Sequence, residues 1–321
     1  MTESELWEEH EDLHRKFVKR LTHLGDSGLS LETIEPHEFN YLDLKNELVN
    51  RILHECVLCE WRCKVDRVDG KKKGACHLDS TARVATFFRH FGEEPPLVDR
   101  SGSGTIFFTS CNFRCCYCQN WDISQAPKAG SPVTSRNLSV MMESLRNEGA
   151  ANINFVGGEP TPNLHMILEA IRSTSVNVPI LWNSNMYLTA EAMNILTDVV
   201  DIWLPDFKYG NDRCAIEYSL VVKYFETTSR NHKIAYENGD MIIRHLVMPG
   251  HVECCTKPIL KWIAENCPRA LVNVMSQYRP EHLVLQQPKR YNKIAHKTSI
   301  QEMREARAYA DQLGLIWRPV S

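Results

Sequence analysis

The ten residues from Cys111 to Asn120, CNFRCCYCQN, hold four cysteines directly after an apolar run, TIFFTS, that is typical of a buried strand. The spacing Cys111-x3-Cys115-x2-Cys118 places three thiols on one short loop. Thiolates are the usual ligands of iron–sulfur clusters, and three of them leave one iron open to a substrate or cofactor. The spacing alone also allows a structural zinc site, with Cys116 as a fourth ligand, or buried inert thiols.

A second group of cysteines lies upstream, at Cys56-x2-Cys59-x3-Cys63-x12-Cys76. This spacing is typical of metal ligands, so the group predicts a second metal site. Zinc and an auxiliary cluster that passes electrons to the first are both open, and lone structural thiols are the alternative. Four further cysteines show no convincing partners and are interpreted as ordinary thiols: Cys214, Cys254, Cys255 and Cys267.

From residue 105 onward, short apolar runs alternate with segments of helix length. The expected strands are 105–109, 153–156, 180–182, 199–204, 241–247 and 271–275. The expected helices are 139–147, 163–173, 190–197, 214–227, 256–266 and 300–313. This alternation predicts parallel strands with right-handed crossovers. Because a complete barrel needs eight such units, six predict an open barrel or a doubly wound sheet.

The first 53 residues are predicted to be a helical extension packed on the main domain. Leu6, Leu13, Phe17, Leu21 and Leu24 recur at helix spacing, Pro36 interrupts the segment, and 41–53 is a second expected helix. Residues 54–98 are predicted to be a cysteine-rich module, and residues 99–321 the barrel.

The composition of the 321 residues excludes several classes of function. The net charge is -3 and no basic stripe is present, which argues against a nucleic-acid partner. No window approaches the roughly 18 apolar residues of a membrane span. The acidic N-terminus lacks the apolar core of a signal peptide, so we expect a cytoplasmic protein with reduced thiols.

The loop Cys111-x3-Cys115-x2-Cys118 resembles the signature of the radical S-adenosylmethionine enzymes, which often carry an aromatic residue where Tyr117 lies. The resemblance implies a partial (β/α)6 barrel with an N-terminal helical and cysteine-rich extension. It implies that the three cysteines hold a [4Fe-4S] cluster, that Cys116 is spare, and that Tyr117 lies by the adenine. One electron from the cluster would cleave S-adenosylmethionine to methionine and a 5′-deoxyadenosyl radical, which takes a hydrogen atom from the substrate.

Two later turns resemble cofactor-binding segments of the same family. Gly157-Gly158-Glu159, after the second expected strand, is similar to a motif whose backbone and acid bind the methionine amino group. Taken alone, the glycines favour a plain strand-to-helix turn with Pro160 and Pro162, but their position one strand after the cysteine loop, as in the family, favours cofactor binding. Asn183 and Asn185 end the third expected strand, where amides can bind a ribose hydroxyl or simply form a turn.

The fourth and fifth expected strands end in charged residues. Asp206-x-Lys208 resembles a segment of pyruvate formate-lyase activating enzymes that lies near the methionine end of the cofactor, where Lys208 would pair with the carboxylate. A surface ion pair is the alternative for Lys208. Arg244, in RHLVMPG, is expected to hold cofactor or substrate, whereas His245 is expected to be a packed or surface histidine.

The stretch HFGEEPP, followed by Gly102-Ser103-Gly104, resembles a subgroup described as homologues of pyruvate formate-lyase activating enzymes. The leading hypothesis is therefore an anaerobic enzyme that takes hydrogen from a backbone glycine of a partner protein, with a flavodoxin or ferredoxin as reductant. Modification of a small molecule or of another peptide side chain is the second hypothesis. A non-enzymatic iron–sulfur electron carrier is the third.

Overall fold

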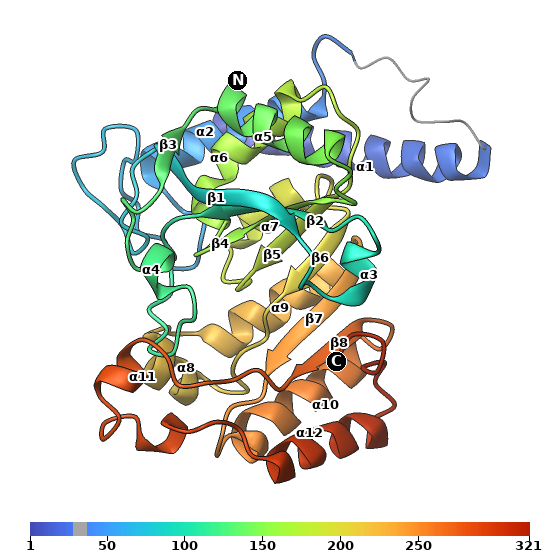
Figure 1. The fold of residues 1–321 in the computed structure, drawn as a ribbon. Coiled ribbons are helices and arrows are strands. Elements are labelled where there is room, and N and C mark those ends of the chain that lie inside the picture. Colours follow the sequence, from blue (N-terminus) through green and yellow to red (C-terminus); the bar gives the residue numbers. More distant parts are fainter. Residues whose placement is uncertain (28–36) are drawn as a thin grey trace.

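The computed structural model describes residues 1–27 and 37–321. Within these residues, the strands form one eight-stranded sheet in the order β3-β1-β2-β4-β5-β6-β7-β8 (Figure 1). Pro36, which we expected to interrupt the N-terminal segment, lies outside the described residues.

Neighbouring strands from β2 to β8 in this order pair in parallel, and together they form the partial barrel. Their bounds are β2 (Ser103–Phe108), β4 (Ile153–Gly157), β5 (Ile180–Ser184), β6 (Ile202–Pro205), β7 (Asp240–Leu246) and β8 (Leu271–Met275). Side chains such as Phe155 and Trp182 are fully buried, as expected for parallel strands covered by helices. The predicted partial (β/α)6 barrel is confirmed.

Helices connect these strands along the chain, and the last of these helices follows the last strand. Their bounds are α5 (Ser135–Asn147), α6 (Leu164–Ser173), α7 (Ala190–Leu196), α8 (Asp212–Ser219), α9 (Tyr224–Glu237), α10 (Lys257–Asn266) and α12 (Ile300–Gln312). Capping boxes fix where two of them begin, at Thr134 before α5 and at Ser299 before α12. Shorter helical segments are α3 (Pro95–Val98), α4 (Trp121–Ser124) and α11 (Leu283–Gln286), with 3-10 turns at Leu53–Glu55, Thr161–Asn163 and Asn292–Ile294.

The prediction of one helix over residues 214–227 is wrong. The chain breaks after α8 because Leu220 takes a left-handed conformation (φ 56°), and α9 begins only at Tyr224. The helix expected from residue 256 also differs at its start, where Val252–Thr256 form a π-helical turn that leads into α10. Both differences lie beside the cysteines that had no predicted partner.

Two strands precede or interrupt the parallel series and were not predicted. β1 (Ala82–His90) pairs antiparallel with β2, and β3 (Ser131–Val133) pairs antiparallel with the start of β1. β1 thus joins the barrel sheet although it precedes residue 99. Its FFRH end carries exposed aromatic rings rather than strict alternation, which is why the pattern gave no clear strand signal.

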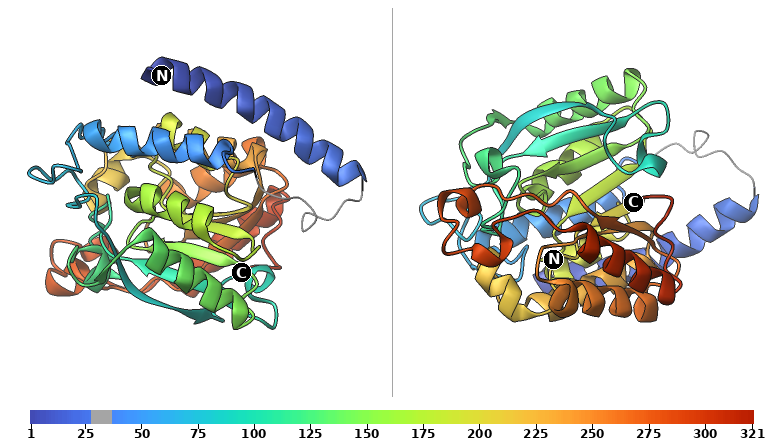
Figure 2. Two further views of the ribbon diagram at one scale, coloured as in Figure 1. Left: turned by 90° about the horizontal axis from the view of Figure 1, so that it is seen from above. Right: turned by 60° about the horizontal axis from the view of Figure 1, so that its bottom comes forward.

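The N-terminal extension forms helices α1 (Glu3–Ser27) and α2 (Tyr41–Ile52), and α1 lies on the outside of the molecule (Figure 2). Lys45, which is buried on α2, donates to Asp198 (3.1 Å) and to the carbonyl of Ile195 (2.8 Å). The hydroxyl of Tyr41 donates to the same carboxylate at 2.9 Å. Leu21 on α1 is 47% exposed, so only the first half of that helix packs as expected.

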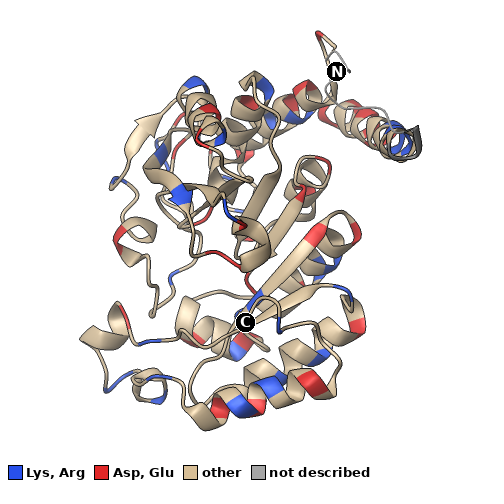
Figure 3. Ribbon diagram, turned by 45° about the vertical axis from the view of Figure 1, so that its right-hand side comes forward, with Lys and Arg blue, Asp and Glu red and all other residues tan. Residues whose placement is uncertain are grey.

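Charged residues of both signs are interspersed over the helices, and red and blue segments alternate along α12 (Figure 3). Among the described residues, none of the helices combines the length and apolar character needed to cross a membrane.

Candidate functional site

A cavity of about 600 Å³ opens at the carboxyl ends of the parallel strands, and it brings together all the residues predicted for the first site. Those residues are Cys111, Cys115, Tyr117, Cys118, Gly157, Gly158, Glu159, Asn183, Asn185, Asp206, Lys208 and Arg244. These residues come from segments that are up to more than a hundred residues apart in the sequence. They meet because the carboxyl ends of parallel strands lie at the same edge of the sheet, here the ends of β2, β4, β5, β6 and β7.

The cysteine loop follows β2 and presents three thiols to the cavity. The amide of Phe113 donates to Cys111 Sγ (3.3 Å), and the hydroxyl of Ser219 donates to Cys115 Sγ (2.9 Å). Cys118 Sγ lies 3.2 Å from the hydroxyl of Ser124. Burial raises the pKa of Cys115 to about 11, whereas the charge of Lys208 acts to lower it.

Cys116 differs from its neighbours because it does not line the cavity. Its backbone amide donates to the carbonyl of Tyr218 (2.8 Å), and its carbonyl accepts from the amide of Val284 (3.2 Å). Its side chain is buried, and burial raises its pKa to about 12. The geometry therefore separates this thiol from the three others on the loop.

Tyr117 begins a chain of hydroxyl groups that returns to the cysteine loop. Its hydroxyl lies 2.7 Å from that of Tyr209, which in turn lies 2.5 Å from the hydroxyl of Ser219. Because Ser219 also contacts Cys115, the aromatic residue before the third cysteine is linked to the second cysteine through side chains.

Gly157 and Gly158 are required by the approach of two backbones. A Cβ on Gly157, whose φ is +120°, would lie 2.2 Å from the carbonyl oxygen of Phe108. A Cβ on Gly158 would lie 1.7 Å from the carbonyl oxygen of Ser110. The paired glycines thus let β4 end directly against the start of the cysteine loop.

Glu159 is 1% exposed, and its carboxylate is already hydrogen-bonded by the protein. Oε1 accepts from the amide and hydroxyl of Thr161 (3.2 and 2.6 Å) and from the hydroxyl of Ser184 (2.7 Å). Oε2 accepts only from the amide of Asn185 (2.9 Å) among the described residues, so this oxygen retains room for another donor. Burial raises the pKa of this carboxyl despite the four hydrogen bonds.

Asn185 contacts the cysteine loop instead of projecting freely into the cavity. Its side-chain amide donates to Asn112 Oδ1 at 2.7 Å and lies 3.7 Å from Cys111 Sγ. Its Oδ1 accepts from the amide of Tyr187 (3.0 Å). These contacts favour the turn-forming alternative for Asn185 and leave Asn183 as the freer amide.

Asp206, Lys208 and Arg244 form one ion-paired group at the ends of β6 and β7. Arg244 Nε donates to Asp206 Oδ1 (2.8 Å), and Lys208 Nζ donates to Asp206 Oδ2 (2.6 Å). Arg244 also donates to Asn183 Oδ1 (2.5 Å). Although burial opposes ionisation, the two cations lower the pKa of Asp206 to about 2. One carboxylate thus pairs with two cations beside the cavity.

Sequence reasoning missed two acids that also line the cavity, Glu93 and Glu94. Glu93 lies 3.6 Å from Arg244 and accepts from the amide of Asn154 (3.1 Å). Glu94 is 6% exposed, and its Oε1 accepts from Asn273 (2.9 Å) while its Oε2 has no hydrogen-bond partner among the described residues. In the sequence, these two acids stood out only as part of the stretch HFGEEPP. They reach the cavity because β1 joins the barrel sheet and carries this stretch to its edge.

The upstream cysteines form a compact unit against the cysteine loop. Burial and, to a smaller extent, charge repulsion from Cys76, Cys56 and Cys63 raise the pKa of Cys59. Three hydrogen bonds join this unit to the loop: Ser110 to the Cys76 carbonyl, Arg114 to the Ala75 carbonyl (2.6 Å) and Trp61 to the Asn112 carbonyl (2.8 Å). The two cysteine groups are therefore structural neighbours.

The interpretation of Cys214, Cys254 and Cys255 as thiols without partners is wrong. Cys214 Sγ lies 4.0 Å from Cys254 Sγ, which lies 3.9 Å from Cys255 Sγ, and His251 is close by. The sequence hid this group because α8 and the π-helical turn are separated by about forty residues of chain.

A barrel with three cavity-lining cysteines after its first parallel strand defines a class of cofactor-dependent enzyme. The family model of the radical SAM superfamily matches residues 105–263. The chain is also 40% identical over 318 residues to "Uncharacterized protein MJ0674" of Methanocaldococcus jannaschii, covering 97% of this chain and 88% of that protein. Residues 105–263 therefore belong to the radical SAM superfamily, whose enzymes use a [4Fe-4S] cluster and S-adenosylmethionine.

Two solved structures show more distant similarity. SuiB of Streptococcus suis bound to its precursor peptide SuiA aligns with a TM-score of 0.49 at 15% identity, over 65% of this chain and 46% of SuiB. The FeFe-hydrogenase maturase HydG of Carboxydothermus hydrogenoformans aligns with a TM-score of 0.40 at 13% identity, over 99% of this chain and 76% of HydG. The chain thus spans less than half of the length of SuiB.

The residues lining the cavity fit these cofactors. Three thiols face one space, and two of them accept hydrogen bonds from an amide and a hydroxyl, as cluster thiolates do. The volume lies within the roughly 300–1,000 Å³ of small-molecule sites. Lys208 and Arg244 are cations that a carboxylate in the cavity could pair with, and Glu159 Oε2 can accept from an ammonium group.

Proposed function

We propose that Cys111, Cys115 and Cys118 bind the [4Fe-4S] cluster and that the enzyme takes a hydrogen atom from a backbone glycine of a partner protein. The observation that carries the proposal is the single cavity in which the three thiols meet the glycine-rich turn and the paired cations. When bound, the cluster and S-adenosylmethionine together supply a 5′-deoxyadenosyl radical, which abstracts hydrogen.

The protein's own groups match the polar ends of S-adenosylmethionine. Lys208 is the better candidate for the carboxylate, because Arg244 is held by Asp206, Asn183 and Glu93. Glu159 Oε2 and the backbone beside Gly158 are the acceptors for the ammonium group. Tyr117 lines the same cavity and offers its ring to the adenine.

An exposed strand edge supports a peptide substrate. Residues 86–90 of β1 pair with β2 on one side, while among the described strands none pairs with them on the other. Phe87 and Phe88 on this edge are 39% and 42% exposed, and His90 at its end lines the cavity. An extended segment that adds to β1 would have backbone partners and apolar contacts and would lead toward the cavity.

A specific observation favours the second candidate, a small-molecule substrate. Glu94 Oε2 is buried, lines the cavity and lacks a partner among the described residues, so it suits a donor on a compact ligand. Membership in a superfamily of enzymes leaves the third hypothesis, an electron carrier, without support.

The test supplies reconstituted enzyme with reductant, S-adenosylmethionine and a deuterated extract of its own cells, split into a protein fraction and a small-molecule filtrate. Deuterium in 5′-deoxyadenosine is then measured by mass spectrometry. Label that arrives only with the protein fraction supports the glycine proposal, and label that arrives only with the filtrate contradicts it in favour of the small molecule.

We propose further that Cys56, Cys59, Cys63 and Cys76 hold a second metal centre. Their spacing in the sequence and the hydrogen bonds that join their segment to the cysteine loop support this assignment. An auxiliary cluster there would lie near the first cluster and could pass electrons to it, whereas a zinc ion would only stabilise the conformation of the cysteine loop. Iron and zinc analysis of the Cys59→Ala variant distinguishes the two.

A further inference from the structure

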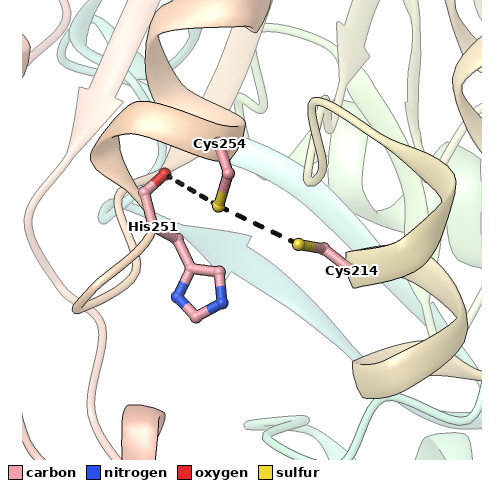
Figure 4. Close-up of side chains that lie close together, drawn as sticks. All are labelled: Cys214, His251 and Cys254. Carbon is pink, nitrogen blue, oxygen red and sulfur yellow. Dashed lines mark hydrogen bonds between the residues drawn. The ribbon is translucent and has the colours of Figure 1, made fainter.

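A third group of metal-binding side chains lies outside the cavity. Cys214 comes from the first turn of α8, while His251 and Cys254 come from the segment after β7 (Figure 4). One ligand atom from each of the three lies within 4.8 Å of the others. None of these residues lines the cavity described above.

The distances between the sulfur atoms match those around one tetrahedral ion. Cys214 Sγ and Cys254 Sγ are 4.0 Å apart, and Cys254 Sγ and Cys255 Sγ are 3.9 Å apart. Zinc–sulfur bonds of about 2.3 Å in tetrahedral geometry place two sulfurs about 3.8 Å apart. Thiolates that bind different irons of a cluster lie farther apart, so this arrangement suits a mononuclear site.

The imidazole of His251 is oriented as a metal ligand. When Nδ1 donates to the carbonyl of Pro249 (2.7 Å), Nε2 carries the lone pair that a metal ion needs. A ligand histidine commonly donates its second nitrogen to a backbone carbonyl in this way. Nε2 now lies 3.1 Å from the hydroxyl of Tyr218, one turn after Cys214 on α8.

Local backbone features bring the ligands together. The π-helical turn Val252–Thr256 carries both adjacent cysteines, and such turns often occur at functional sites. A Cβ on Gly210 would lie 2.8 Å from the Cα of Cys255, so only glycine allows this approach. The amide of Asn211 donates to the carbonyl of Cys254 (2.7 Å) and lies 3.7 Å from Cys255 Sγ.

We propose that Cys214, His251, Cys254 and Cys255 bind one Zn²⁺ ion in a structural site. Cys214, His251 and Cys254 supply three ligands, and Cys255, whose Sγ lies 3.9 Å from Cys254 Sγ, would supply the fourth. Three sulfurs and one imidazole nitrogen would then complete the tetrahedral coordination that is usual for structural zinc. Burial of Cys214, His251 and Cys255 leaves little access for substrate.

The ion would fix the first turn of α8, and the last turn of the same helix supports the cysteine loop. Tyr218 and Ser219 on α8 accept from the amides of Cys116 and Arg114 through their carbonyls (2.8 and 3.1 Å). By joining α8 to the segment after β7, the zinc ion would hold the cysteine loop against the barrel. The ion itself would take no part in the reaction.

The experiment measures zinc and iron per chain in the full-length protein, purified without oxygen and reconstituted with iron and sulfide. Cys214→Ala and Cys254→Ala are compared with the wild type and with Cys267→Ala. Cys267 is also buried, but its surroundings contain no other thiol among the described residues. Each ligand variant is expected to lose one zinc per chain while Cys267→Ala loses none. Because zinc held by the upstream cysteines contributes equally to the wild type and to each variant, the difference in zinc content reports only the proposed site.

A second measurement does not depend on how the ligand variants fold. X-ray absorption at the zinc edge of the Cys59→Ala variant should show three sulfurs at about 2.3 Å and one nitrogen at about 2.0–2.1 Å. Zinc-free wild-type protein, unchanged zinc in Cys254→Ala, or a disulfide between Cys214 and Cys254 in anaerobically alkylated protein would each overturn the proposal.

Discussion

The hydroxyl of Ser219 lies 2.9 Å from the sulfur of Cys115. This contact joins the end of α8 to the cysteine loop across about a hundred residues of chain. Hydrogen bonds to ligand sulfurs favour the reduced, more negative state of an iron–sulfur cluster. The position of α8 therefore bears directly on how readily the proposed cluster accepts an electron.

Ser219→Ala should lower the reduction potential of the cluster without removing it. Loss of a contribution of about 1 kcal/mol to the reduced state corresponds to a shift of about 40 mV. Redox titration followed by electron paramagnetic resonance measures the potential. Ser229→Ala, on α9 away from the cavity, is the matched control, and an equal potential in both variants would show that the hydroxyl does not act on the cluster.

Gly158→Ala should destabilise the protein and lower its iron content. The added Cβ meets backbone, at 1.7 Å from the Ser110 carbonyl, so the cysteine loop itself must shift. We expect a loss of more than about 2 kcal/mol in the free energy of unfolding, measured with denaturant.

Gly314→Ala is the control for that substitution. Its Cβ would meet nothing within 4 Å, although its φ of +69° disfavours alanine. The expected loss is only about 1 kcal/mol, with iron content unchanged. Equal losses of stability and of iron in the two variants would show that the close contact between β4 and the cysteine loop does not require glycine at position 158.

Buried histidines should make the protein lose stability in mild acid. Burial lowers the pKa of His232 and of His245 from 6.5 to about 4. Because the folded pKa is the lower one, the unfolded chain binds protons first as the pH falls below about 6.5, and stability decreases toward pH 4. Each imidazole contributes up to about 3 kcal/mol. Urea unfolding of the metal-free protein across this range should show the decline, and His232→Gln should flatten it; an unchanged slope would contradict the assignment.

Cys59→Ala should leave the first cluster in place and alter only the second metal centre. Hydrogen bonds from the side chains of Trp61 and Arg114 to backbone carbonyls join the segments of the two cysteine groups, but the groups share no proposed ligand. Iron and zinc analysis, with visible spectra of the reconstituted protein, measures the outcome. Loss of all bound iron would show that the two groups do not act separately.

The sequence predicted the barrel well because each parallel strand is a short apolar run that ends in polar residues. Cys111, Glu159, Asn183, Asp206 and Arg244 each lie at or near the end of such a run, and parallel pairing must bring these ends together. Their detailed roles were less predictable, since the glycines at 157 and 158 meet protein backbone as well as the cavity.

The contacts that the sequence did not reveal all depend on tertiary packing. Ser219 reaches Cys115 only because the helix expected over 214–227 ends at Leu220. Cys214 meets Cys254 only because a π-helical turn and a close approach at Gly210 bring two segments together. Neither the end of α8 nor the π-helical turn produces a periodic pattern in the sequence from which it could be predicted.

The central claim is that the three cavity-lining thiols hold the cluster that cleaves S-adenosylmethionine. A comparison of variants at the adjacent residues Cys115 and Cys116 tests this claim most directly. Cys115 lines the cavity, whereas the neighbouring Cys116 does not. The measurement is 5′-deoxyadenosine formed by reconstituted, reduced enzyme. The account predicts no product from Cys115→Ala and near wild-type product from Cys116→Ala. Undiminished product from Cys115→Ala would contradict the cluster assignment.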